Sequence, residues 1–303
     1  MNNASLPLNE ASVRALQGYD RPVLTDYYLG TVLYNLVRAG KVEGQSLRLR
    51  VDEPEHRHYS QVVRFLVHLG VITPLRSYAD GAVFLLLGRQ KPSPLEVLCT
   101  TDPFAYASHL TAMEYHGLTD RVPTTIYLTS PPPAEWRELA VERMGKDLGE
   151  KVESYRMAGF PTLRRYRVTR LERRAIHVLH KKNAGAYVVT EHGHLRVSSI
   201  GRTFLDMIQT PEYCGGIRHV MDVFRTHART YLKLLLSDVE RHGAAIDKAR
   251  VGYILEEECG IHDPIIDHWQ ETAVQRGGSR KLDAKSPYEA TYSERWCLSL
   301  NHL

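Results

Sequence analysis

Two amphipathic helical segments followed by a hairpin pattern dominate the first ninety residues, and this order restricts the fold more than any other feature. In VLTDYYLGTVLYNLVRAG (residues 23–40) and YSQVVRFLVHLG (residues 59–70), apolar side chains recur at helical spacing until a closing glycine. VITPLRSYADGAVFLLLG (residues 71–88) contains two short strand patterns around an Asp-Gly turn. The order helix, helix and hairpin is typical of a winged helix-turn-helix domain.

In such a domain the helix before the hairpin is the recognition helix, and the hairpin is the wing. Arg64 can offer a forked donor to guanine and Gln61 can pair with adenine, while Arg76 at the wing can contact phosphate or the minor groove. The predicted DNA-binding residues are Arg57, His58, Ser60, Gln61, Arg64, His68 and Arg76, with further positive charge upstream at Arg48 and Arg50. The alternatives are a small helical domain whose charges are merely solvated and a winged helix that mediates protein contacts only.

The rest of the chain has room for a second, larger domain. With 303 residues, about two domains are expected, and GRQKPSPLEVL (residues 88–98) is the predicted linker because glycine and prolines interrupt the periodic pattern there. We therefore predict a DNA-binding domain over residues 1–90 and a C-terminal domain over residues 91–303. The fold class is α+β: an N-terminal winged helix-turn-helix followed by a larger mixed α/β domain.

In the C-terminal domain, strand patterns precede a cluster of helical patterns. Strands are expected over residues 124–130, 165–170, 175–180 and 186–200, with a last strand near residue 298. Helices are expected over residues 131–145, 200–210, 217–228, 230–243, 244–260 and 262–277, with Gly145, Gly243 and Gly277 as stops and Thr230 and Asp263 as caps.

Charge and cysteine usage limit the class of protein. The net charge of +4 and the pI of about 8.8 are compatible with nucleic-acid binding without being diagnostic of it. No uncharged apolar run of about 18 residues is present, and the first residues lack a secretory signal pattern, so no membrane partner is expected. The four cysteines stand far apart without a CxxC pair, which favours reduced thiols in the cytoplasm.

The segment DPFAYASHLTAMEYHGL (residues 102–118) carries two histidines among small and apolar residues. A helix is expected from an N-cap at Asp102 to a stop at Gly117. In that helix His109 and His116 would share a face but lie about 10 Å apart along the axis, which is too far for one zinc ion. We predict that His109 packs and that His116 caps the helix C-terminus.

Other groups of histidines and carboxylates give weaker candidates for a metal site. HDPIIDHW holds His262, Asp263, Asp267 and His268, but Asp263 and the following proline are explained as a helix start. TEHGHL places His192 and His194 around a glycine, as turns do. The sequence contains no GxSxG, HExxH, GxxxxGK[ST] or GxGxxG motif. We therefore expect no catalytic residue, no cofactor and no metal.

One run of the C-terminal part is strongly basic. RRYRVTRLERRAIHVLHKK (residues 164–182) has eight Lys/Arg and one acidic residue. Where strand alternation holds, Arg165, Arg167 and Arg173 would share one face. Such a strip can bind phosphate backbone or an acidic partner; the alternative is a solvated face. The basic strip comprises Arg164, Arg165, Arg167, Arg170, Arg173 and Arg174.

Three blocks of the sequence resemble the C-terminal domain of AbiEi-type antitoxins. They are YASHLTAMEYHGLTDRVPTTIYLTS, VSSIGRTFLDMIQTPEYCGGIRHVMDVF and AAIDKARVGYILEEECGI, and together they span about 160 residues in the family's order. The matching positions are Ser108, His109, His116, Gly117, Arg202, Thr203, Asp206, Gly252 and Tyr253. We expect most of them to be architectural, including an Arg202–Asp206 pair at i, i+4.

The resemblance implies an antitoxin and transcriptional repressor of a type IV toxin–antitoxin system, found in bacterial abortive phage-infection systems. In this family the N-terminal domain binds repeats in the operon's promoter, and the C-terminal domain neutralises a nucleotidyltransferase-like AbiEii toxin, directly or indirectly. The chain departs from the family's shorter winged helix through the segment KVEGQSLRLRVDEPEHRHY (residues 41–59), so the DNA-reading residues are not transferred from the family.

Two other function classes stay open. The chain could be an enzyme, a metal-dependent nuclease or transferase that counteracts the toxin through its histidine and aspartate clusters. It could also be an interaction module that sequesters the toxin through the basic strip. A stoichiometric bound ion favours the first, and co-purification with the toxin favours the second.

Overall fold

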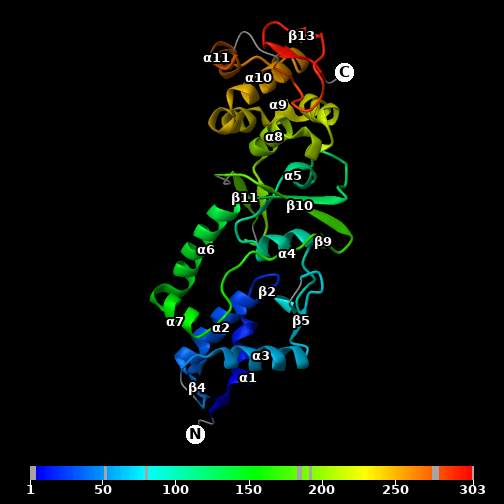
Figure 1. Ribbon diagram of the computed structural model, residues 1–303. Helices are drawn as coiled ribbons and strands as arrows, with labels where there is room; N and C mark the ends of the chain where they lie inside the picture. The colour runs from blue at the N-terminus through cyan, green and yellow to red at the C-terminus, as the bar shows by residue number, and fades with distance from the viewer. Residues whose placement is uncertain are drawn as a thin grey trace. The chain divides into compact units, whose positions relative to one another are not determined.

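The computed structural model describes residues 5–50, 53–78, 81–182, 186–190, 193–274 and 280–301, and its architecture mixes helices and strands in an α+β fold (Figure 1). The chain forms two compact units. Unit 1 comprises Met1–Ala105, Ser130–Arg174 and His180–Asn183, and unit 2 comprises Tyr106–Thr129, Ala175–Leu179 and Ala184–Leu303.

This division differs from the predicted boundary at residue 90. The predicted linker over residues 88–98 contains the start of α4 (Pro94–Thr101), because Ser93 and Glu96 form a capping box with proline at the first helical position. Later in the sequence, α6 (Pro133–Leu148) and α7 (Val152–Met157) also belong to unit 1. Their residues Trp136 and Tyr155 are buried in the same core as the N-terminal helices.

The N-terminal part of unit 1 contains the predicted helices and hairpin. Its elements are α1 (Leu8–Gln17), β2 (Leu24–Thr25), α2 (Asp26–Ala39), α3 (His56–His68), β5 (Ile72–Pro74) and β6 (Val83–Leu86). Strand β6 pairs antiparallel with both β2 and β5, which gives the sheet order β2-β6-β5. Gly40 and Gly70 follow α2 and α3 with φ of 63° and 69°, which glycine adopts without a steric cost. The Asp-Gly turn of the hairpin falls partly outside the described residues.

A second small sheet joins a strand that precedes α1 to two strands that lie between α2 and α3 in the sequence. Its strands are β1 (Leu6–Pro7), β3 (Lys41–Val42) and β4 (Gln45–Arg48), in the order β1-β4-β3. Side chains of β4 and the residues after it alternate: Leu47 and Leu49 pack against the core, whereas Arg48 and Arg50 are exposed.

In unit 2, strands precede a cluster of helices, as predicted. The six-stranded sheet has the order β11-β12-β7-β8-β10-β9, and the residues of its edge strand β9 fall within unit 1. The strands are β7 (Tyr106–Ala107), β8 (Thr125–Ser130), β9 (Arg170–Leu171), β10 (Arg174–His180), β11 (Tyr187–Val189) and β12 (Arg196–Ser198), with β13 (Tyr292–Ser293) and β14 (Leu298–Ser299) as a separate pair. The helices are α5 (His109–Tyr115), α8 (Ile200–Gln209), α9 (Ile217–His242), α10 (Ala245–Tyr253) and α11 (Pro264–Thr272). A 3₁₀ turn, η3 (Pro211–Cys214), follows α8, and a π-helical turn, η4 (Ile254–Glu258), follows α10.

The predicted helix over residues 102–116 is wrong in its first half. Asp102 follows α4, and its carboxylate accepts hydrogen bonds from Phe104 N and from Trp136 Nε1. Residues 106–107 form β7, which pairs with β8 and β12. These residues are almost fully buried, so their backbone groups are satisfied by sheet pairing. Only the end of the prediction holds, because α5 finishes before Gly117, whose φ is 65°.

Three other helix boundaries differ from the prediction. Helix α6 continues through Gly145 to Leu148, because Met144 and Leu148 are core residues. The expected pair of helices over residues 217–243 is one helix, α9, with a non-helical residue at Tyr231 beside the predicted cap. Helix α11 begins as expected, with the Asp263 side chain accepting from Ile265 N, but it ends at Thr272. Its predicted stop at residue 277 lies outside the described residues.

Candidate nucleic-acid interface

Helix α3 presents a polar stripe on the side away from the core. Val62 and Leu66 are buried, whereas Arg57, Gln61, Arg64 and His68 are exposed. Successive spacings of four, three and four residues place these four side chains on one helical face. The α3 stripe, defined by these four residues, therefore contains four of the seven predicted DNA-binding residues.

Two of the predicted DNA-binding residues serve the helix itself. His58 is 7% exposed, and its Nδ1 accepts a hydrogen bond from Glu55 N at 3.0 Å within a capping box. Burial lowers the pKa of His58, and the nearby Arg57 lowers it further, although Glu55 opposes both. Ser60 Oγ lies 3.3 Å from His56 Nδ1. These contacts stabilise the first two turns of α3, so His58 is not presented for base contact.

Both arginines of the stripe have short-range partners at the surface. Arg57 Nε lies 2.8 Å from Glu55 Oε2, and both side chains are about half exposed. Arg64 Nε donates to Ser60 O at 3.2 Å within its own helix. Arg76, the predicted wing residue, is exposed after β5 in the hairpin. Exposed contacts of this kind contribute little to stability, so the guanidinium groups can exchange them for a ligand at small cost.

A polar groove of about 470 Å³ lies at the first turn of α3. Its lining includes Arg48, Arg50, Arg57 and Gln61, together with Pro7 and Asn9 at the start of α1. Three arginines from two segments thus converge with the N-terminal end of a helix. We call this the arginine groove. The prediction named Arg48 and Arg50 only as added charge; the alternation of apolar and basic residues from Leu47 to Arg50 was the available signal.

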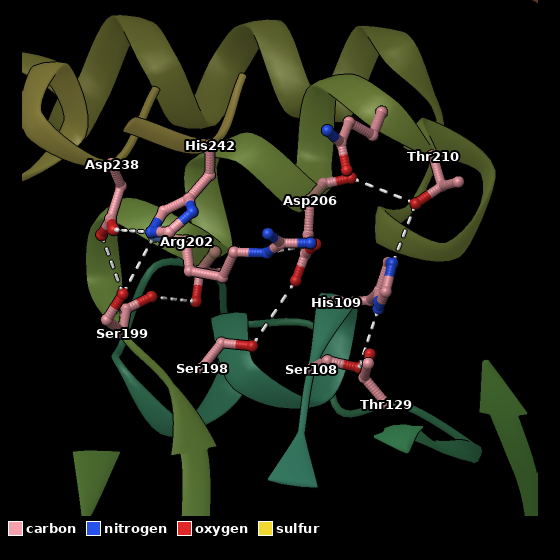
Figure 2. A network of polar contacts seen from close by, with 12 residues as sticks. Ser108, His109, Thr129, Ser198, Ser199, Arg202, Asp206, Thr210, Asp238 and His242 are labelled. Atoms are coloured by element: carbon pink, nitrogen blue, oxygen red, sulfur yellow. Dashed lines mark hydrogen bonds and ion pairs between the residues drawn. The ribbon is translucent and has the colours of Figure 1, made fainter. Parts of the chain in front are cut away.

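In unit 2, a buried polar network surrounds His109, as Figure 2 shows. His109 is fully buried; its Nδ1 lies 2.8 Å from Ser108 Oγ, and its Nε2 lies 2.8 Å from Thr210 Oγ1. Thr129 Oγ1 donates to Ser108 Oγ at 2.9 Å. Both imidazole nitrogens are therefore occupied by hydroxyl groups, which fits the predicted packing role. Local sequence patterns did not identify Thr129 and Thr210, because they come from distant segments.

The predicted Arg202–Asp206 pair extends this network along α8. Arg202 Nε lies 3.0 Å from Asp206 Oδ1, and the Asp206 side chain is fully buried. Burial alone would lower the pKa of Arg202, but the adjacent Asp206 carboxylate raises this pKa above its ordinary value. Ser199 Oγ donates to Asp238 of α9 at 2.9 Å, as Figure 2 also shows. The network ties α8 to α5, β8 and α9.

Other family-matching positions also have structural roles. His116 Nε2 lies 2.6 Å from Ser198 O, so its contact joins the end of α5 to β12 rather than to its own helix carbonyls. Thr203 is buried, and its hydroxyl donates to Ser199 O. At Gly252 a Cβ atom would lie 2.1 Å from the Trp296 ring, so only glycine lets α10 approach this indole. Tyr253 is buried in the adjoining core.

The predicted basic strip does not form one strand face. Residues 161–168 lie outside any strand, and β9 begins only at Arg170. Arg164 Nη2 lies 3.0 Å from Asp26 Oδ2, and Arg165 Nη2 donates to Pro131 O at 2.8 Å. These two arginines help to hold unit 1 together. Arg167, Arg170 and Arg173 are exposed, and the half-buried Arg174 begins β10.

The candidate metal cluster around His262 divides among separate contacts. Asp263 caps α11, Asp267 lies 3.4 Å from Arg295, and His262 lies 3.8 Å from Glu256. Within the described residues, three or more histidine, cysteine or acidic side chains nowhere converge as metal ligands would. His192 lies outside the described residues.

Every helix of the described residues is too short or too polar to cross a membrane.

No protein-family model and no curated protein matches the chain. Among solved structures, the RV2827C protein from Mycobacterium tuberculosis is similar at 12% sequence identity and a TM-score of 0.49, over 96% of this chain and 90% of that chain. The function of this chain is therefore inferred from its own sequence and structure.

Proposed function

We propose that this chain is the antitoxin and DNA-binding autorepressor of a bacterial type IV toxin–antitoxin operon. Unit 1 binds double-stranded operator DNA, and unit 2 neutralises a nucleotidyltransferase-like toxin in the cytoplasm. The chain needs no catalysis, cofactor or metal of its own for either role.

The connectivity of unit 1 supports a winged helix at its N-terminal end. The elements α1, β2, α2, α3, β5 and β6 follow one another, and the strands have the order β2-β6-β5. This arrangement places a helix directly before a hairpin, as a winged helix does with its recognition helix and wing.

The α3 stripe carries the proposal. It consists of two arginines, a glutamine and a histidine on one exposed face of the helix. Guanidinium and carboxamide groups are the side chains that make bidentate bonds to guanine and adenine in the major groove. We therefore assign base contacts to Gln61 and Arg64 and a backbone contact to Arg76.

The antitoxin role rests on the resemblance of the C-terminal blocks to AbiEi-type antitoxins. The matching polar residues Ser108, His109, Arg202 and Asp206 are buried or nearly so and bonded to one another or to neighbouring groups. Such residues maintain a scaffold, and the scaffold's surface then provides the contact or signal that neutralises the toxin.

A mobility-shift assay tests the repressor role. Full-length protein is titrated onto the DNA directly upstream of its own gene at low salt, with an unrelated duplex of equal length as competitor. We expect a shift that the competitor removes only in large excess. Absence of binding to the upstream DNA would refute the repressor role.

A growth assay tests the antitoxin role separately. The adjacent toxin gene is induced in bacteria with and without this chain, and growth is followed. We expect rescue by the full chain and by a variant with Gln61 and Arg64 changed to alanine, because neutralisation does not need operator binding. Growth arrest despite expression of the folded full chain would refute the antitoxin role.

A further inference from the structure

The arginine groove extends beyond the helix–helix–hairpin pattern that supports the winged helix, although Arg57 and Gln61 of α3 also line it. Two of its arginines, Arg48 and Arg50, come from the segment between α2 and α3, in which the chain departs from the shorter family pattern. We infer that this groove binds a phosphodiester group of duplex DNA beside the bases that α3 contacts. The inference rests on the proposed DNA-binding function of unit 1 and adds a second, sequence-independent contact to it.

The register of the small sheet fixes the geometry of the groove. Strand β1 pairs parallel with β4, and Pro7 is the register partner of Arg48. Helix α1 begins at the next residue, Leu8, so its N-terminus lies beside Arg48. Strand β4, α1 and α3 lie side by side within unit 1 (Figure 1).

The groove has the chemistry of an anion site. Arg48, Arg50 and Arg57 line it, and none of the described residues in its lining is a carboxylate. No side chain of the described residues caps the first turn of α1, which leaves backbone N–H groups and the positive end of the helix dipole at the groove. Arginine forks and helix N-termini both bind phosphate oxygens well. Glu55 competes for Arg57 as its partner at the surface.

The position of the groove favours DNA backbone over a free anion. Gln61, which belongs to the α3 stripe, also lines the groove. A duplex whose base edges face Gln61 and Arg64 therefore brings its flanking phosphates to Arg48 and Arg50. Contacts of this kind fix the register of the protein on DNA without reading sequence.

Salt dependence of DNA binding tests the inference. Fluorescence anisotropy is measured from 50 to roughly 300 mM salt with the upstream duplex and an unrelated duplex. For Arg48→Ala/Arg50→Ala, two lost phosphate contacts should reduce the slope of log K against log salt by about 1.8. Affinity at low salt should fall roughly tenfold or more, by the same factor for both duplexes.

Three variants serve as controls. Arg48→Gln/Arg50→Gln should behave like the alanine variant, which excludes a folding defect peculiar to alanine. Arg48→Lys/Arg50→Lys should retain the wild-type slope, because the charges remain. Arg137→Ala/Arg156→Ala removes two exposed arginines on α6 and α7 and should leave the slope unchanged.

The outcomes separate this inference from the proposed function. If the wild type binds the upstream duplex specifically but the alanine and glutamine variants keep its slope, the groove does not bind phosphate, and the repressor role survives. If the wild type binds neither duplex at 50 mM salt, the repressor role fails and the inference fails with it. A loss of affinity confined to the upstream duplex would also overturn the inference, since it would make the groove a reader of sequence.

Discussion

His109 Nε2 lies 2.8 Å from Thr210 Oγ1, although 101 residues separate the two in the sequence. The other nitrogen of the same ring contacts Ser108 Oγ, so one buried imidazole joins the start of α5 to the end of α8. His109 also has a positive φ of 52°, which non-glycine residues adopt only when the surrounding contacts hold them there. The histidine therefore acts as a structural link within unit 2.

Removing this link should destabilise the protein. His109→Ala removes one hydrogen-bond partner each from the hydroxyls of Ser108 and Thr210 and opens a cavity, so the free energy of unfolding should fall by about 2–4 kcal/mol. Urea denaturation followed by circular dichroism measures the change. His262→Ala, at a side chain that is 76% exposed, is the control and should change the free energy by no more than about 0.5 kcal/mol. Equal stability of the two variants would contradict the role of His109.

Two glycines in helices should respond oppositely to alanine. At Gly252 the new Cβ atom would lie 2.1 Å from the Trp296 ring, so Gly252→Ala should cost about 1–3 kcal/mol of stability. At Gly145, inside α6, nothing lies within 4 Å of an added Cβ, so Gly145→Ala should stabilise by about 0.5–1 kcal/mol. Thermal melts of both variants test this pair. A Gly252→Ala variant as stable as the wild type would show that α10 can move away from the indole.

Stability should decrease on mild acidification. Burial lowers the pKa of His116, and its hydrogen bond with Ser198 O only partly offsets this effect. In the unfolded chain the histidine has a pKa of about 6.5. Between this value and the lower pKa of the folded state, the unfolded chain therefore binds more protons than the folded one. The free energy of unfolding should fall as the pH drops below about 6.5 and should level off below the folded pKa.

Replacement of His116 checks this pH dependence. His116→Gln should give a flatter curve of unfolding free energy against pH. His58 and His219, whose pKa values burial also lowers, should account for the slope that persists in His116→Gln. A wild-type stability that is constant from pH 7 to 5 would contradict the assignment.

The two classes of DNA contact should separate by mutation. Arg64→Ala should cost about 1–3 kcal/mol of binding free energy at one operator position and relax the base preference there. Arg76→Ala should weaken operator and unrelated DNA alike and lower the salt slope by about 0.9. Anisotropy with a set of singly substituted operators measures both effects, and Arg137→Ala is the control. Uniform losses from both substitutions would show that Arg64 contacts backbone rather than a base.

Local patterns in the sequence determined the elements whose residues act on their near neighbours. The spacing of Val62 and Leu66 against Arg64 and His68 set the buried and exposed faces of α3, because helical periodicity needs no distant contact. The Asp263-Pro264 start of α11 and the glycine after α2 were equally local features. The mixed α+β composition followed from the same periodicities.

Only the tertiary structure decided where the chain divides and what its buried polar residues contact. Residues 106–107 became a strand because pairing with β8 and β12 satisfies their buried backbone, which local helix signals do not register. The return of residues 130–174 to unit 1, the His109–Thr210 contact and the pairing of Pro7 with Arg48 all join segments far apart in the chain. Such contacts depend on how whole elements pack, so a pattern that spans a few residues cannot encode them.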